Sequence, residues 1–170
     1  MSCVLMVIAP EMFRDEEYEH PKTVLEQRGA TVTTASVAPG TCRGKLGMRA
    51  TATIAVADAD ARDYDAVVFV GGDGASVFFD DPHAHQLARA ASENGRVLAA
   101  ICIAPGILAR AGLLAGRRAT AFESEKADLI THGALFTGAP VEVDGRVITA
   151  NGPAAARLFG EAIADALGLH

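Results

Sequence analysis

Four short apolar runs divide the chain, and polar stretches with helical spacing separate them. Residues 3–9, 64–70 and 97–101 are almost continuously apolar, whereas residues 30–35 alternate and are rich in β-branched side chains. Continuous apolar runs are typical of strands buried on both faces of a parallel sheet, and alternation is typical of a strand with one solvated face. The pattern therefore predicts four strands.

The intervening stretches carry helix start and stop signals. Asp15 is a candidate N-cap, Arg28 and Gly29 form a stop, and Asp81 followed by Pro82 begins another helix. The expected helices cover residues 15–28, 83–94, the segment with Ile107 and Leu108, 124–133 and 154–167. A loop with a small β excursion at 39–56, a short strand at 119–122 and a hairpin at 141–149 complete the pattern. Strands alternating with helices predict an α/β sandwich around a mainly parallel sheet, formed by one domain over residues 1–170.

Cys102 lies where the fourth strand turns into a helix. Small residues and Pro105 follow it, which permits a sharp strand-to-helix turn. The first amides of a helix and its dipole stabilise an anion, so we expect Cys102 to ionise more readily than a free thiol. The alternative is that Cys102 is a small buried hydrophobic residue, as most free cysteines are.

An acidic cluster follows the first strand and contains Glu11, Glu16 and Glu17. Acidic residues are favoured in the first turn of a helix, so a solvated helix start explains the cluster. The loops at the carboxyl ends of parallel strands meet at one edge of the sheet, however, and one of these carboxyl groups could face Cys102.

The third strand runs into the sequence Gly71-Gly72-Asp73-Gly74. It lacks the third glycine and the downstream acidic residue of a dinucleotide fingerprint. Amides at such a turn, next to the turn at Cys102, could form half of an oxyanion hole. The sequence 80–85 holds aspartate and histidine, but a capped helix start explains it better than a metal site does.

Composition excludes several classes of protein. The 170 residues carry 15 basic and 21 acidic side chains, a net charge of -6, and no tryptophan. The sequence therefore lacks the clusters of basic and aromatic residues that are typical of nucleic-acid-binding proteins. Cys3, Cys42 and Cys102 are odd in number and far apart, which indicates free thiols rather than a disulfide framework or a zinc ribbon. No apolar run approaches a membrane span and the start lacks a basic signal head, so we expect a soluble, cytoplasmic protein.

The chain resembles the ThiJ/PfpI superfamily, which includes the Parkinson-disease-associated protein deglycase and the Pfp-type intracellular proteases. The likeness runs nearly end to end. Its markers are the acidic loop after the first strand, the sequences 70–72 and 100–105, and the segments 143–145 and 148–153. The resemblance implies a flavodoxin-like three-layer sandwich with a nucleophile-elbow cysteine, assembled as a homodimer or a larger homo-oligomer.

By position, the resemblance makes Cys102 the nucleophile and Glu17, four residues before Pro21, the carboxylic acid that hydrogen-bonds its sulfur. Glu11 and Glu16 are weaker candidates for that acid. A protonated Glu17 would donate to the thiolate and lower the thiol pKa, which requires burial that raises the pKa of the carboxyl. The backbone amides of Gly72 and Ile103 match the family's anion pocket.

The chain departs from the family at three positions. Ile103 stands where the Pfp-type proteases have a histidine directly after the cysteine, and Phe122 stands where the deglycase has one. The glutamate that a neighbouring subunit contributes in those proteases falls near Ser76. Without either histidine the thiol has no visible base, so a lowered thiol pKa would have to activate it.

Three functions therefore stay open. The first is a cysteine-dependent enzyme that acts on small electrophiles or reactive carbonyls, as a glyoxalase or deglycase does, without cofactor or metal. The second is a stress protein whose Cys102 is oxidised reversibly and which acts as a redox sensor or chaperone. The third is a cysteine peptidase or amidase, which the missing histidines disfavour.

Overall fold

The computed structural model describes residues 1–170 and is built around a seven-stranded sheet. All neighbouring strands are parallel except the β11–β12 hairpin, which is antiparallel. From one edge to the other the strands are β11 (Val141–Asp144), β12 (Val147–Ala150), β8 (Val97–Ile101), β7 (Ala66–Phe69), β1 (Cys3–Val7), β3 (Thr31–Ser36) and β6 (Ile54–Ala55). The predicted α/β sandwich around a mainly parallel sheet is confirmed.

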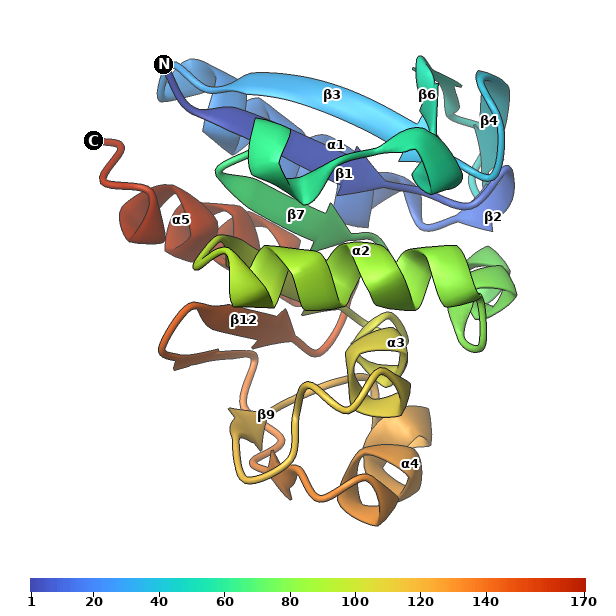
Figure 1. The fold of residues 1–170 in the computed structure, drawn as a ribbon. Coiled ribbons are helices and arrows are strands. Elements are labelled where there is room, and N and C mark those ends of the chain that lie inside the picture. The colour runs from blue at the N-terminus through green and yellow to red at the C-terminus, as the bar shows by residue number, and fades with distance from the viewer.

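Helices cover both faces of this sheet, and the two chain ends lie on the same side of the molecule (Figure 1). The helices α1 and α5 pack against each other on one face, and α2 and α3 pack on the other. The α-helices are α1 (Asp15–Gln27), α2 (Pro82–Glu93), α3 (Pro105–Arg110), α4 (Lys126–Thr131) and α5 (Ala156–Ala166). Short 3-10 helices are η1 (Val56–Asp58), η2 (Ala61–Asp63), η3 (Asp73–Phe78), η4 (Glu123–Glu125) and η5 (Pro153–Ala155). No helix is both long enough and apolar enough to cross a bilayer.

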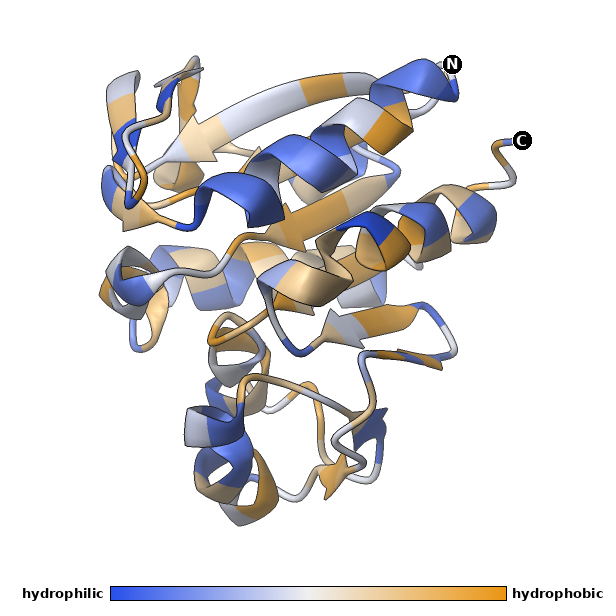
Figure 2. Cartoon of the chain, turned by 180° about the vertical axis from the view of Figure 1, so that it is seen from behind, coloured by the Kyte–Doolittle hydropathy of each residue, from blue (hydrophilic) through white to orange (hydrophobic).

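Successive residues of each central strand enter different cores. In β1, Val4 and Met6 belong to the core under α1 and α5, whereas Leu5 and Val7 belong to the core under α2 and α3. Figure 2 shows the strands at the centre of the molecule as largely hydrophobic, while α1 carries long hydrophilic stretches. The continuous apolar runs of the sequence exist because these strands are buried on both sides.

Two small sheets lie outside the main one. The first has the order β2 (Glu11–Phe13), β4 (Gly40–Gly44) and β5 (Arg49–Ala52), and the second pairs β9 (Arg118–Ala119) with β10 (Leu135–Phe136). The strand expected at 119–122 is thus only two residues long and begins one residue earlier. Strand β2 was not predicted, because its three residues follow the first strand too closely to form a separate apolar pattern.

Candidate active site

Cys102 stands at a strained turn between β8 and α3. Its backbone has a φ of 64°, in the left-handed region that non-glycine residues rarely adopt. Hydrogen bonds fix both sides of the residue: its amide donates to the carbonyl of Ala150 at 2.9 Å, and its carbonyl accepts from the amide of Phe122 at 2.8 Å. The side chain is left at the edge where the parallel strands end, which is the position expected of a nucleophile elbow.

Glu17 on α1 is the carboxyl group that the fold brings to this thiol. The residue is fully buried, and neither of its carboxylate oxygens completes a hydrogen bond of good geometry. The polar groups that act on it are the thiol of Cys102, the guanidinium of Arg14 and the backbone of Gly71. Glu11 lies on the exposed part of β2 and Glu16 is hydrogen-bonded to Arg14, so Glu17 alone of the three candidates faces Cys102.

Burial raises the pKa of Glu17 to about 7, because an ionised carboxylate there loses its hydration. The thiol of Cys102 and the guanidinium of Arg14 act in the opposite direction but do not compensate. Near neutral pH, Glu17 therefore holds its proton in a large fraction of molecules. In that form it can donate a hydrogen bond to an anion on the sulfur.

The pKa of Cys102 is shifted in the direction opposite to the one expected from the helix start. Burial raises it to about 12, and the negative charge of Glu17 is the next cause, while the amides of Gly72 and Ile103 lower it. Helix α3 has only six residues, so its dipole is a weak counterweight. The effect of Glu17 depends on its ionisation: once protonated, Glu17 donates to the sulfur and stabilises a thiolate. Cys102 and Glu17 thus compete for one proton.

The glycine turn after β7 allows these groups to meet. A Cβ atom on Gly71 would lie 2.5 Å from Oε1 of Glu17 and 2.7 Å from the Cβ of Cys102. Gly72 has a φ of 98°, and a Cβ there would collide with the backbone that leads from β2 into α1. The missing side chains bring the amide of Gly72 to the sulfur from one side, and the amide of Ile103 approaches from the other.

A cavity of about 170 Å³ opens over the thiol. Four of its ten lining residues lie in the turns after β7 and β8, and Arg14 and Glu17 come from the start of α1, so the cavity lies at the carboxyl edge of the parallel sheet. The lining residues are Arg14, Glu17, Lys45, Gly72, Asp73, Cys102, Ile103, Phe122, Ser124 and Pro153. None of them is a histidine, so the cavity offers no imidazole base. Ser76 lies outside the lining and donates to the carbonyl of Asp73 at 3.1 Å.

Arg14 and Lys45 also line the cavity, although no local pattern in the sequence predicts this position for either residue. Asp15, expected to cap α1, does not cap it: the N-cap is Arg14, which makes no side-chain cap. The carboxylate of Asp15 instead accepts from the amides of Leu46 at 3.0 Å and Met48 at 2.9 Å. It thereby fastens the β4–β5 turn, with Lys45, beside the start of α1. These contacts span more than 30 residues and leave no local signal.

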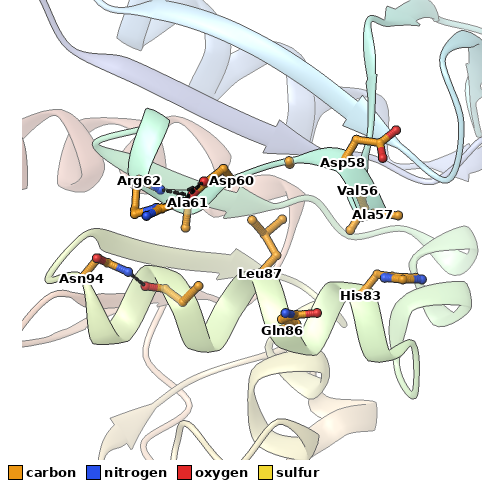
Figure 3. Close-up of a pocket in the computed structure, with 12 residues that line it drawn as sticks. Val56, Ala57, Asp58, Asp60, Ala61, Arg62, His83, Gln86, Leu87 and Asn94 are labelled. Carbon is orange, nitrogen blue, oxygen red and sulfur yellow. Dashed lines mark hydrogen bonds and ion pairs between the residues drawn. The ribbon is translucent and has the colours of Figure 1, made fainter.

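A larger hollow of about 450 Å³ lies elsewhere, between the η1–η2 segment and α2 (Figure 3). Three of its six polar side chains are paired with one another or with the backbone: Arg62 binds Asp60 at 2.7 Å, and Asn94 binds the carbonyl of Ala90 at 2.7 Å. It contains neither a cysteine nor a buried carboxyl. Chemistry is therefore better supported at Cys102. No group of three or more histidine, cysteine or acidic side chains is placed to hold a metal ion.

Comparison with known proteins gives a consistent result. The model of the DJ-1/PfpI family matches residues 2–166. The deglycase PH1704 of Pyrococcus horikoshii is 33% identical over 151 residues, covering 89% of this chain and 90% of the relative. YraA of Bacillus subtilis, named as a candidate cysteine protease, is 32% identical over 154 residues, covering 90% and 91%. The crystal structure of a ThiJ/PfpI domain protein from Brachyspira murdochii superposes with a TM-score of 0.96 at 31% identity, covering 98% of this chain and 96% of that one.

Proposed function

The chain belongs to the DJ-1/PfpI family, and on that premise we propose that it is a cysteine-dependent enzyme acting on small reactive carbonyl compounds. The observation that carries the proposal is the buried pair of Cys102 and Glu17 beneath a small cavity, with two backbone amides at the sulfur. The name of the deglycase relative from Pyrococcus horikoshii agrees with this chemistry.

The geometry supports an addition step in which the proton and the charge balance. The thiolate of Cys102 forms a bond to the carbonyl carbon, and the π electrons move to the oxygen. The amides of Gly72 and Ile103 hold the developing oxyanion, and Glu17 supplies the proton that converts it to a hydroxyl group. The product of this step is a hemithioacetal and a carboxylate at Glu17, which can accept a proton later.

Turnover of 2-oxoaldehydes tests the proposal. Loss of methylglyoxal or glyoxal is followed for the wild type, for Cys102→Ser and for Cys3→Ser, the last as a matched control on a thiol outside the cavity. We expect activity in the wild type and Cys3→Ser and none above background in Cys102→Ser. Equal rates in all three proteins, with every aldehyde tried, would reject a Cys102-dependent carbonyl enzyme.

The same pair supports a second candidate function, a redox sensor or stress chaperone without turnover. Oxidation of Cys102 to a sulfinic acid places a negative charge on the sulfur, where the protonated Glu17 and the amides of Gly72 and Ile103 can donate to it. Peroxide treatment followed by mass spectrometry tests this function. Sulfinic acid should build up at Cys102 ahead of Cys3 and Cys42, and it should fall in Glu17→Ala. Equal oxidation of all three cysteines would argue against it.

A peptidase or amidase is the least supported function. The name of YraA points toward it, but Ile103 and Phe122 occupy the two family histidine positions and the cavity lining has no imidazole. A Cys–His mechanism would therefore lack its base. Hydrolysis of casein that disappears in Cys102→Ser would revive this function.

We propose further that the protein works in the cytoplasm as a homodimer or larger homo-oligomer. Large apolar side chains at the surface near the site support the assembly: Met12 is 41% exposed, Leu46 64% and Phe122 47%. Light scattering at micromolar concentration is the test. A mass of one chain at all concentrations would contradict the proposal.

A further inference from the structure

Two cations stand at the mouth of the Cys102 cavity. Arg14 at the start of α1 and Lys45 in the β4–β5 turn both line it, and their side chains are 28% and 40% exposed. They come from segments 31 residues apart, and the contacts of Asp15 with the amides of Leu46 and Met48 hold the two segments together. The positions of both cations are thus set by the fold.

The guanidinium of Arg14 is held in one orientation by Glu16, and one of its nitrogens makes no hydrogen bond within the protein. Its Nε and Nη2 donate to the carboxylate of Glu16 at 3.1 and 3.0 Å, and Nη1 has no partner within the protein. Glu16 is outside the cavity lining, so the pair orients Arg14 without adding the charge of Glu16 to the cavity. An oriented guanidinium with a free N–H is a good donor to a carboxylate.

The second cation, Lys45, forms only a weak ion pair within the protein. Nζ of Lys45 lies 3.4 Å from Oδ2 of Asp73, whose side chain is 72% exposed. Exposed ion pairs of this kind contribute little, so a substrate carboxylate can share or replace Asp73. The deepest acidic group, Glu17, is neutral in many molecules near pH 7 because burial raises its pKa. Of the four basic and carboxylic side chains that line the cavity, the two cations Arg14 and Lys45 therefore outweigh Asp73 as long as Glu17 holds its proton.

We infer that Arg14 and Lys45 are specificity residues that favour electrophiles bearing a carboxylate next to the reacting carbon. The inference rests on the proposed thiol chemistry at Cys102 and names its substrate class, small 2-oxo acids or aldehydes with a carboxylate. The carboxylate contacts Nη1 of Arg14 and Nζ of Lys45, and this holds the neighbouring carbon over the sulfur. In a cavity of about 170 Å³ such a molecule has room for few other orientations.

Alkylation by a matched pair of reagents tests this selectivity without any turnover. Iodoacetate and iodoacetamide react in the same way: the sulfur forms a bond to carbon, and the C–I bond breaks to release iodide. They differ only in a carboxylate against a neutral amide. The ratio of their rates at Cys102, resolved by mass spectrometry, cancels the fraction of thiolate, because both rates are measured in the same protein at the same pH.

The ratio of iodoacetate to iodoacetamide rates should fall about two- to fivefold in Arg14→Gln and in Lys45→Gln, the range that a partly exposed ion pair supports. Added salt should lower it in the wild type. Lys22→Gln is the matched control: it removes one positive charge from α1, where Lys22 pairs with Glu26 away from the cavity, and should leave the ratio unchanged.

A lower rate ratio in either variant supports the preference for carboxylates and assigns it to the substituted cation. A ratio that is unchanged in both variants overturns the inference. Lys45 is partly exposed and its pair is weak, so Lys45→Gln serves as the test if Arg14→Gln does not fold. Because the readout is alkylation, it is independent of aldehyde turnover. Failure of the carbonyl chemistry and failure of the carboxylate preference are therefore separate results.

Discussion

The backbone amide of Arg14 donates a hydrogen bond of 2.9 Å to the carbonyl oxygen of Gly71. This bond joins the start of α1, which carries Glu17, to the glycine turn after β7, which lies against Cys102. Two segments that are more than 50 residues apart in the chain are thus held next to each other at the edge of the sheet. The distance between the carboxyl group of Glu17 and the thiol of Cys102 depends on this contact.

Gly71→Ala should disrupt the site directly. The added Cβ would lie 2.5 Å from Oε1 of Glu17 and 2.6 Å from the carbonyl oxygen of Ile101, and that backbone atom cannot move without shifting β8. Overpacking of this kind costs about 1–3 kcal/mol of the free energy of unfolding. We expect urea denaturation to show a loss of free energy of unfolding in that range. The rate of Cys102 alkylation should differ from that of the wild type as well.

Gly152→Ala is the control for this effect. Its φ of 162° is ordinary extended backbone, and the nearest atom to an added Cβ is 3.8 Å away, on Phe122. The control should unfold within about 0.5 kcal/mol of the wild type. If Gly71→Ala were as stable as Gly152→Ala, the close approach of Glu17 to the glycine turn would be wrong.

Stability should fall as the pH rises, because of Glu17. Burial raises its pKa from 4.5 to about 7, so the folded state binds more protons than the unfolded state between these values. The contribution is fully present below pH 4.5 and is lost as the pH rises through 7. The shift in the pKa of Glu17 corresponds to a change of about 3 kcal/mol in the free energy of unfolding.

Urea denaturation at pH 5 and pH 8 measures this dependence. Glu17→Gln keeps a neutral side chain of the same shape, so its free energy of unfolding should change less between the two pH values than that of the wild type. Glu26→Gln, on the exposed part of the same helix, is the matched control and should follow the wild type. Parallel curves for wild type and Glu17→Gln would show that Glu17 ionises normally.

The rate of Cys102 alkylation, plotted against pH, should show a step that is caused by the ionisation of Glu17. In the wild type the pair of Cys102 and Glu17 loses its first proton near the pKa of about 7 that burial gives Glu17, mainly from Glu17, and a fixed minor share of the singly ionised pair carries its charge on the sulfur instead. The rate should rise to a plateau there and rise again only toward the high pKa of the thiol. Glu17→Gln should remove the first rise. Identical profiles for both proteins, with Cys3 and Cys42 resolved separately, would mean that the two groups do not share a proton.

Local patterns were sufficient for the elements that carry the reactive groups. The strand 97–101 has the same bounds in the structure, and Asp81 caps α2 by accepting from the amides of His83 and Ala84 at 3.3 Å. Both features depend on neighbours in sequence, burial on both faces in one case and a three-residue cap in the other. The turn at Cys102 follows because a strand must end where small residues and Pro105 begin a helix.

Features that depend on packing could not be predicted in this way. The raised pKa of Cys102 comes from burial and from Glu17, which is 85 residues away in sequence, and these outweigh the local helix start. Arg14 and Lys45 meet at the cavity because β2 pairs with β4 and because Asp15 binds the turn after β4. The capping rule applied to Asp15 was wrong because its carboxylate finds better donors in a distant turn.

Asp15→Ala should therefore act at a distance from the helix it was expected to cap. It removes the acceptor for the amides of Leu46 and Met48, and the loss of two hydrogen bonds to a buried carboxylate should cost about 2–3 kcal/mol. Because the β4–β5 turn also loses its anchor, proteases should cleave near Lys45 faster than in the wild type, and the rate ratio of iodoacetate to iodoacetamide at Cys102 should drop. Asp60→Ala serves as the control: it removes an aspartate that caps η2 and pairs with Arg62 outside the cavity, so as a lost cap it should lower the free energy of unfolding by less than Asp15→Ala does, but change neither cleavage near Lys45 nor the rate ratio. Unchanged cleavage near Lys45 together with unchanged stability would show that Asp15 does not hold the turn in place.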